Sequence, residues 1–132
     1  PAHAGNTASP HVYFHPYKFS PDRRGRAVVL SEFGGYALPV EEHTTGKKLF
    51  GYRKYTSSAQ LTKAFKTLYR GQILPAVKKG LCGCIYTQLT DVEGEMNGLF
   101  TADRAVCKID SASLRSINAA LAASLRRKEE PR

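Results

Sequence analysis

The sequence predicts an α/β fold in which short parallel strands alternate with helices. Residues 27–30 and 81–86 are short, continuous apolar runs next to glycines, which is typical of strands buried on both faces of a parallel sheet. An apolar repeat of about 3.6 residues, the period of a helix, fills the interval between the two runs, and another follows the second run. The order strand, helix, strand, helix indicates a βαβα unit.

Length and composition fit one small domain with a real core, because 42% of the 132 residues are hydrophobic. No apolar run approaches the roughly 18 residues of a membrane span, so we expect no membrane partner. Residues 1–10 also lack the features of a signal peptide. Cys82, Cys84 and Cys107 are odd in number and lack C-x-x-C spacing. We expect buried, reduced thiols, no metal or cofactor, and a cytoplasmic location, because oxidising compartments pair their cysteines.

The formal net charge of +9 would favour nucleic acid as a partner if the cations formed one face or stripe. They are dispersed instead. Residues 23–26 lie in a turn-like segment, residues 78–79 close a helix, and residues 126–128 belong to a polar tail. We therefore expect no nucleic-acid partner, and a basic nucleic-acid-binding module is kept only as an alternative.

The N-terminal part of the chain carries weak signals. Residues 11–19 are rich in aromatic side chains and histidine but are broken by Pro16, so we expect a short strand that runs into a loop. The apolar strand at residues 27–30 is followed by a long segment with Pro39, Gly46 and Gly51, which predicts a loop.

The first helix is predicted over residues 58–79. Ser57 and Gln60 have the spacing of a capping box, and Gly80 supplies a stop signal after two lysines. Pro75 should kink this helix, because it lacks a backbone donor and crowds the carbonyl of Gly71. The apolar stripe consists of Leu61, Ala64, Phe65, Leu68, Tyr69, Ala76 and Val77.

A last helix is predicted over residues 112–125, capped by Asp110 or Ser111. Its apolar side carries Leu114, Ile117, Leu121 and Leu125. A charged tail, residues 127–132, follows.

Two stretches carry candidate chemistry. Glu32 comes just after the first strand, where ligands meet parallel sheets, although an ordinary carboxylate that caps a turn fits the position equally well. Residues 86–98 combine an aromatic ring, an amide and alternating acids after the second strand, which resembles a sugar site. A calcium loop is disfavoured, because Met96 occupies the glycine position and Ala102 the position of the last acid.

Together, VVLSEFGG (residues 28–35) and YTQLTDVEGEMNGL (residues 86–99), closed by Asp103-Arg104, resemble the end of the catalytic domain of family 2 glycoside hydrolases. This family includes β-galactosidases, β-glucuronidases and β-mannosidases. The resemblance spans about residues 11–118. Two separate motifs at compatible spacing make it more specific than either motif alone.

The resemblance implies that the chain belongs to a (β/α)8 TIM barrel. Residues 27–126 would be its C-terminal part, with strands seven and eight and their helices, and residues 1–26 an irregular segment around strand six. Glu32 matches the nucleophile of a retaining β-glycosidase. His11, His15 and Tyr13 are candidates to keep Glu32 ionised.

The resemblance also implies a substrate pocket formed by Tyr86, Asp91, Glu95 and Asn97. Family members often place a tryptophan under the sugar, whereas this chain has Tyr86 there and no tryptophan. In β-glucuronidases an Asn-x-Lys triplet binds the sugar carboxylate, and here these positions read Glu95-Met96-Asn97. A neutral sugar such as galactose is therefore favoured.

One departure from the family concerns the acid/base glutamate. In the family it follows an asparagine at the fourth strand, and this chain contains no Asn-Glu dipeptide. Retaining hydrolysis needs two carboxyl groups, so we expect the isolated chain to be inactive. Its partners would be a carbohydrate and either the remainder of the barrel or further copies of itself. The alternative is a non-catalytic fragment that self-associates.

Overall fold

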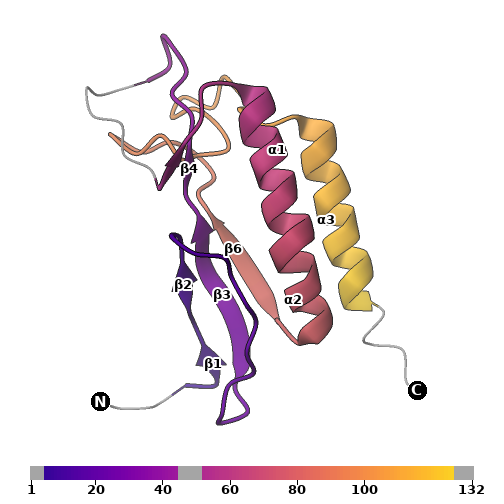
Figure 1. Ribbon diagram of the computed structural model, residues 1–132. Helices are drawn as coiled ribbons and strands as arrows, with labels where there is room; N and C mark the ends of the chain where they lie inside the picture. Colours follow the sequence, from indigo (N-terminus) through magenta and orange to yellow (C-terminus); the bar gives the residue numbers. More distant parts are fainter. Residues whose placement is uncertain (1–4, 45–51, 127–132) are drawn as a thin grey trace.

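The computed structural model describes residues 5–44 and 52–126. It forms two layers, with a parallel sheet on one side and helices covering one of its faces (Figure 1). Strand β3 is central. It pairs along one edge with β1 and then β2, and along the other edge with β6, always in parallel. These strands are β1 (Thr7–Ala8), β2 (His11–Val12), β3 (Ala27–Gly34) and β6 (Gly83–Thr87).

Strand β3 is twice as long as the predicted run, because Ser31 to Gly34 continue the pairing. His11 of β2 is in register with Glu32, and Thr87 of β6 with Gly34. The predicted position of Glu32, just past the strand, is therefore wrong: Glu32 lies within β3. A register shift between Leu30 and Phe33 leaves both of these side chains buried in the core.

The long helix is interrupted as Pro75 predicted, but by a π-helical turn. Helix α1 (Ser58–Leu68) runs into η1 (Tyr69–Ile73) and then α2 (Leu74–Lys79). The backbone N–H of Leu74 donates to the carbonyl of Tyr69, one residue further back than in an α-helix. Pro75 then falls in the first turn of α2, where its missing donor costs little.

Both helix starts confirm the predicted caps. Ser57 Oγ accepts a hydrogen bond from Gln60 N at 3.2 Å, whereas the Gln60 side chain reaches Thr56 instead of the backbone of Ser57. Helix α3 (Ser111–Arg126) is capped by Asp110, whose Oδ2 accepts from Ser113 N at 2.7 Å. At the other end of the long helix, Gly80 has φ 132° and closes α2.

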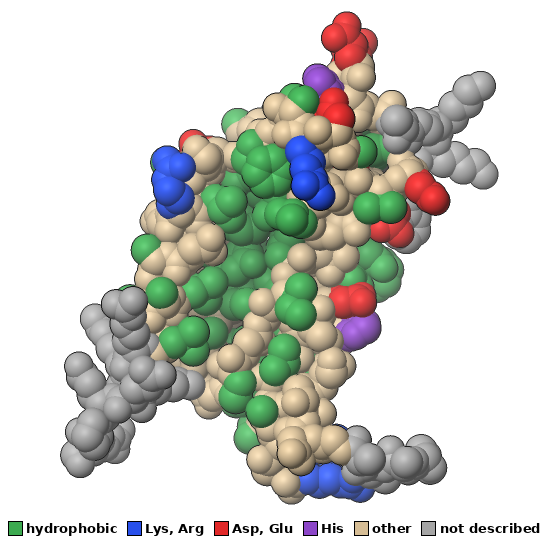
Figure 2. Space-filling model, turned by 180° about the vertical axis from the view of Figure 1, so that it is seen from behind, with side chains coloured by type: hydrophobic (Ala, Val, Ile, Leu, Met, Phe, Trp, Pro, Cys, Tyr) green, Lys and Arg blue, Asp and Glu red, His purple; other side chains and the backbone are tan. Residues whose placement is uncertain are grey.

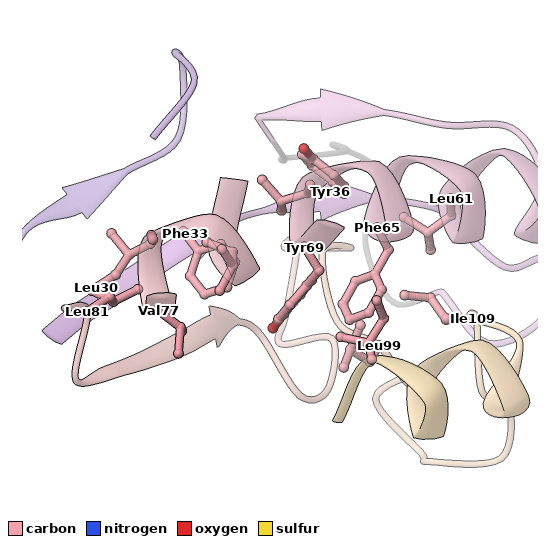
Figure 3. Packing of buried hydrophobic residues seen from close by; sticks show 14 of the residues in the cluster. Leu30, Phe33, Tyr36, Leu61, Phe65, Tyr69, Val77, Leu81, Leu99 and Ile109 are labelled. Atoms are coloured by element: carbon pink, nitrogen blue, oxygen red, sulfur yellow. The ribbon is translucent and has the colours of Figure 1, made fainter. Parts of the chain in front are cut away.

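The core lies between the sheet and the helices, as the labelled side chains of Figure 3 show. Phe33 of β3 meets Tyr69 of η1 edge-on, and Phe65 of α1 packs on the same tyrosine with ring centroids 4.5 Å apart. Ile117 of α3 is buried and Leu114 and Leu121 pack against the core, as predicted. Leu125, expected on the same side, is exposed instead.

The segment predicted as a loop contains a small second sheet. Strand β4 (Tyr36–Ala37) pairs in parallel with β5 (Arg53–Lys54). Two residues per strand carry no periodic signal, so the sequence gives no sign of them. Pro39 lies in the connection as expected, whereas Gly46 and Gly51 lie outside the described residues.

The expected burial of the cysteines is wrong in part. Cys82 is exposed, and Cys84 and Cys107 are intermediate, all three as free thiols. Cys82 precedes β6 and is not held between the sheet and the helices, whereas burial raises the pKa of the Cys84 thiol. Within residues 5–44 and 52–126, no helix is long and apolar enough to cross a membrane.

One face of the sheet is left without helices. Side chains alternate along a strand, so Cys84 and Tyr86 of β6 pack against the core, while Ile85 points the other way and is 59% exposed.

Apolar side chains gather in a hollow on the side of the molecule seen in Figure 2. Among the described residues, the exposed large hydrophobic side chains are Phe14, Ile85, Leu89, Val92 and Leu125.

Candidate active site

Glu32 lies near the carboxyl end of β3, on the sheet face opposite the helices. Its neighbour Phe33 is buried in the core, and successive strand residues point to opposite faces. The Glu32 side chain is 45% exposed. A carboxylate in this position is supported by the sheet yet remains accessible to a ligand.

Two residues of the β2 region contact the same oxygen of Glu32. The Tyr13 hydroxyl donates a hydrogen bond of 2.6 Å to Oε2, and His11 Nδ1 lies 3.2 Å from that oxygen. The parallel register that pairs His11 with Glu32 brings both side chains to this point. His15, the third candidate, is exposed and lies 3.4 Å from the carbonyl of Pro16.

Tyr13 also connects the site to β6. Its hydroxyl oxygen lies 3.1 Å from Thr87 Oγ1, and because the phenol proton goes to Glu32, the Thr87 hydroxyl donates this second bond. Burial, and then the hydrogen bond to Glu32, raise the pKa of Tyr13 to about 12. At neutral pH the phenol is therefore protonated and serves as a donor to the carboxylate.

Tyr86 lies on the other side of the sheet from this cluster. Its ring contacts Phe33, Phe65 and Tyr69, and its hydroxyl is buried with no hydrogen-bond partner among the described residues. Burial strongly raises its pKa. The structure thus gives Tyr86 a place in the core, and Thr87, the next residue, is the β6 side chain beside Glu32.

Asp91 is buried in a network with Lys108. Lys108 Nζ donates to both Asp91 carboxylate oxygens, at 2.6 and 2.8 Å, and to the carbonyls of Leu38 and Met96. Gly98 N donates to Asp91 Oδ1 at 2.8 Å. The pair ties the connection after β4 to the segment after β6. Sequence reasoning missed Lys108, whose only signal is a cation within an apolar stretch.

Glu95 and Asn97 are joined by Gln88. Gln88 Nε2 donates to Asn97 Oδ1 at 2.8 Å and to Glu95 Oε2 at 3.2 Å. Asn97 is buried, whereas Glu95 is exposed. Because Gln88 directly follows Thr87, this polar network begins next to the Glu32 cluster, and its role in binding substrate stays a prediction.

Comparison with protein-family models and with curated proteins found no match to this chain. The chemistry of the site is therefore inferred from its geometry. The half-exposed carboxylate of Glu32, near the end of β3, accepts a hydrogen bond from the protonated phenol of Tyr13, and the His11 imidazole and the Thr87 hydroxyl lie beside them. Such a group can act as a nucleophile or as a general base. In residues 5–44 and 52–126, no group of three or more His, Cys, Asp or Glu side chains is placed to hold a metal ion.

Proposed function

We propose that this chain is the C-terminal part of a (β/α)8 barrel of a retaining β-glycosidase, with Glu32 as the nucleophile. The observation that carries the proposal is the position of Glu32 at the carboxyl end of β3, on the uncovered sheet face, with Tyr13 donating to it at 2.6 Å. In barrel enzymes this end of the sheet carries the chemistry.

In this reaction Glu32 attacks the anomeric carbon and the leaving oxygen takes a proton from a second carboxyl group, about 5 to 5.5 Å away. A water molecule then cleaves the glycosyl ester. Among the described residues, the hydrogen-bond and ion-pair partners of Glu32 are Tyr13 and His11, and neither is a carboxylic acid. We infer that the remainder of the barrel supplies the acid and that the 132-residue chain alone does not turn over.

The free surfaces of the sheet support a larger barrel. Within the described part of the chain, β6 pairs with β3 alone, so its other edge has unpaired backbone groups. Ile85 exposes an apolar side chain on the face without helices. Open edges and apolar sheet faces are covered when strands close into a barrel.

The substrate inferred is a terminal β-linked neutral sugar, such as galactose. Where β-glucuronidases carry a cation for the sugar carboxylate, this chain has Asn97, and its side-chain oxygen accepts from Gln88. Glu95, two residues earlier, is exposed. A carboxylate at this position repels a charged sugar and accepts hydrogen bonds from the hydroxyls of a neutral one.

The test is substitution of Glu32 in the protein that contains the complete barrel. Glu32→Gln should abolish nearly all hydrolysis of aryl β-galactosides, because the amide cannot form the glycosyl ester. Glu32→Gly should regain activity with azide, which enters the vacated space and attacks in its place. Glu41→Gln, which changes an exposed glutamate, is the matched control. Wild-type turnover by Glu32→Gln excludes Glu32 as the nucleophile.

The second candidate is a non-catalytic fragment that self-associates, and the free edge of β6 favours it. Two copies could pair through this edge and shield Ile85. Sedimentation of the 132-residue chain tests it. A concentration-dependent dimer that Ile85→Lys dissociates supports this candidate, and a folded monomer at micromolar concentration contradicts it.

A further inference from the structure

Tyr52 and Tyr13 form a stacked pair beside Glu32. Their ring centroids lie 3.8 Å apart and the rings are 8° from parallel. Phe14 meets the Tyr52 ring edge-on at 5.0 Å. The three rings form a column that ends, through the Tyr13 hydroxyl, on the Glu32 carboxylate.

The backbone is shaped to admit the Tyr52 ring. Tyr52 N donates to the carbonyl of Gly35 at 3.0 Å, and Gly35 has φ +64°, a conformation that favours glycine. A Cβ atom at Gly35 would lie 2.3 Å from Tyr52 Cδ2 and 3.2 Å from Tyr13 Cδ1. Gly35, the residue that follows β3, is therefore where the Tyr52 ring passes over the backbone.

Tyr13 lies outside the strands and helices, so contacts of its side chain, and not a regular backbone, hold it in place. It follows the two-residue strand β2, and Phe14, the next residue, is 77% exposed. The ring carries one hydroxyl that must face both Glu32 and Thr87. The hydroxyl oxygen lies on the axis about which the ring flips, so only a swing of the whole side chain about χ1 would break these contacts. A parallel stack on one ring face opposes such a swing.

We propose that Tyr52 is a positioning residue, whose ring holds the Tyr13 hydroxyl on the reacting carboxylate of Glu32. The meaning of this role for catalysis rests on the proposed function, whereas the contact itself does not. Tyr52 directly precedes β5, so a side chain next to β5 would control the hydrogen bonding of a carboxylate in β3.

The pKa of Tyr13 reports this contact. Its rise to about 12 comes first from burial and second from the bond to Glu32, with a smaller contribution from Tyr52. Loss of the Tyr52 ring exposes the phenol to water and loosens its bond to Glu32. Both changes return the pKa toward its ordinary value of 10.0. The titratable neighbours of Tyr13 include Glu32 and Tyr52, and His11 is also close, because its Nδ1 lies 3.2 Å from the same Glu32 oxygen that accepts from Tyr13.

The experiment is a pH titration of the 132-residue chain with labelled tyrosine, followed by NMR, with Tyr13→Phe to assign the Tyr13 signal. We expect Tyr52→Ala to lower the Tyr13 pKa by about one unit or more, and Tyr52→Phe, which keeps the ring, to leave it near 12. Tyr55→Ala is the matched control, because Tyr55 lies in the same segment but packs on Tyr36. Circular dichroism confirms that each variant is folded.

An unchanged Tyr13 pKa in folded Tyr52→Ala overturns the proposal. An equal fall in Tyr52→Phe overturns it too, because the phenol and not the stacked ring would then be responsible. Where Tyr52→Ala does not fold, Tyr52→Leu repeats the test with a side chain that fills part of the space. The proposed function and the role of Tyr52 fail in different experiments. Hydrolysis by Glu32→Gln would refute the proposed function, and it would leave the result of the Tyr13 titration in the Tyr52 variants unchanged.

Discussion

At the scale of single residues, the adjacent glycines after Phe33 make room for two rings. Gly35 admits Tyr52, as described above, and Gly34 admits Tyr86. A Cβ atom at Gly34 would lie 2.3 Å from Tyr86 Cε2, and Gly34 has φ +92°. Gly34 therefore makes room for a ring of the core, and Gly35 makes room for a ring beside the candidate site.

We predict that Gly34→Ala lowers the free energy of unfolding by more than about 2 kcal/mol, because it combines overpacking with a strained backbone. Gly71→Ala is the control. Gly71 lies in the π-helical turn, and nothing is within 4 Å of its added Cβ, so this change should stabilise by about 0.5 to 1 kcal/mol. Denaturant unfolding measures both, and equal stability of Gly34→Ala and wild type would contradict the packing described for Tyr86.

Lys108 gives a second prediction at this scale. Lys108→Met removes the cation that pairs with the buried Asp91 carboxylate, which keeps the hydrogen bond from Gly98 N, and it removes one donor from each of the carbonyls of Leu38 and Met96. Breaking a buried ion pair in this way costs about 3 to 5 kcal/mol. Lys54→Met removes an exposed cation and should change stability by less than about 0.5 kcal/mol. Thermal unfolding compares them, and similar midpoints would show that the pair is dispensable.

At the scale of elements, the parts that could be predicted were those with local signals. The caps at Ser57 and Asp110 and the stop at Gly80 rest on residues close in sequence, and all three are found. Strand β2 confirms the short strand expected within residues 11–19, whereas β1, β4 and β5 have two residues each, too few for an apolar period. They form because β3 and the connection after it offer edges to pair with, which no local pattern reveals.

The turn before β3 provides a pH-dependent test. Arg26 donates to both carboxylate oxygens of Asp22, at 2.8 and 3.0 Å. This bonding holds the pKa of Asp22 well below its ordinary value of 3.8. A lowered folded-state pKa stabilises the protein above the unfolded pKa, and the contribution is lost as the pH falls through 3.8 toward the folded-state value.

We therefore predict that Asp22→Asn lowers the thermal midpoint at pH 7 and that the difference from wild type shrinks below about pH 4. Asp103 is the carboxylate used for comparison. It is exposed and lies in a distant loop, where hydrogen bonds with Thr101, His43 and the backbone of Ala105 lower its pKa. Thermal scans over this pH range decide the matter. A difference that stays constant from pH 7 to pH 2.5 would show that the Asp22 carboxylate does not contribute through its ionisation.

At the scale of the whole molecule, the candidate site is built from four parts of the chain. Glu32 could be singled out as a candidate from the sequence, because it closely follows the apolar run at residues 27–30. Its link to Thr87 and Tyr52 depends on the pairing of β3 with β6 and of β4 with β5, which the sequence does not specify. The sequence resemblance assigns Tyr86 to the substrate pocket, at the position where a tryptophan often lies under the sugar. The alternation of β6 instead turns Tyr86 toward the helices.

The βαβα order is confirmed at this scale, and barrel closure is a proposal. The described strands form an open parallel sheet with helices on one face, and the other face carries Glu32, Thr87 and the exposed Ile85. A closed barrel would bury that face and bring a second carboxyl group toward Glu32. The central claim is therefore that Glu32 is the group that forms the covalent bond.

The most direct test is covalent trapping of the nucleophile in the protein that contains the complete barrel. A 2-deoxy-2-fluoro-β-galactoside with a dinitrophenyl leaving group needs little acid assistance, and its fluorine slows hydrolysis of the glycosyl ester once Glu32 has displaced dinitrophenolate. Mass spectrometry of the digested protein should place the fluorosugar on the peptide that contains Glu32, and Glu32→Gln should remain unlabelled. A label on another carboxylate, such as Glu41 or Glu95, or equal labelling of Glu32→Gln, would contradict the account.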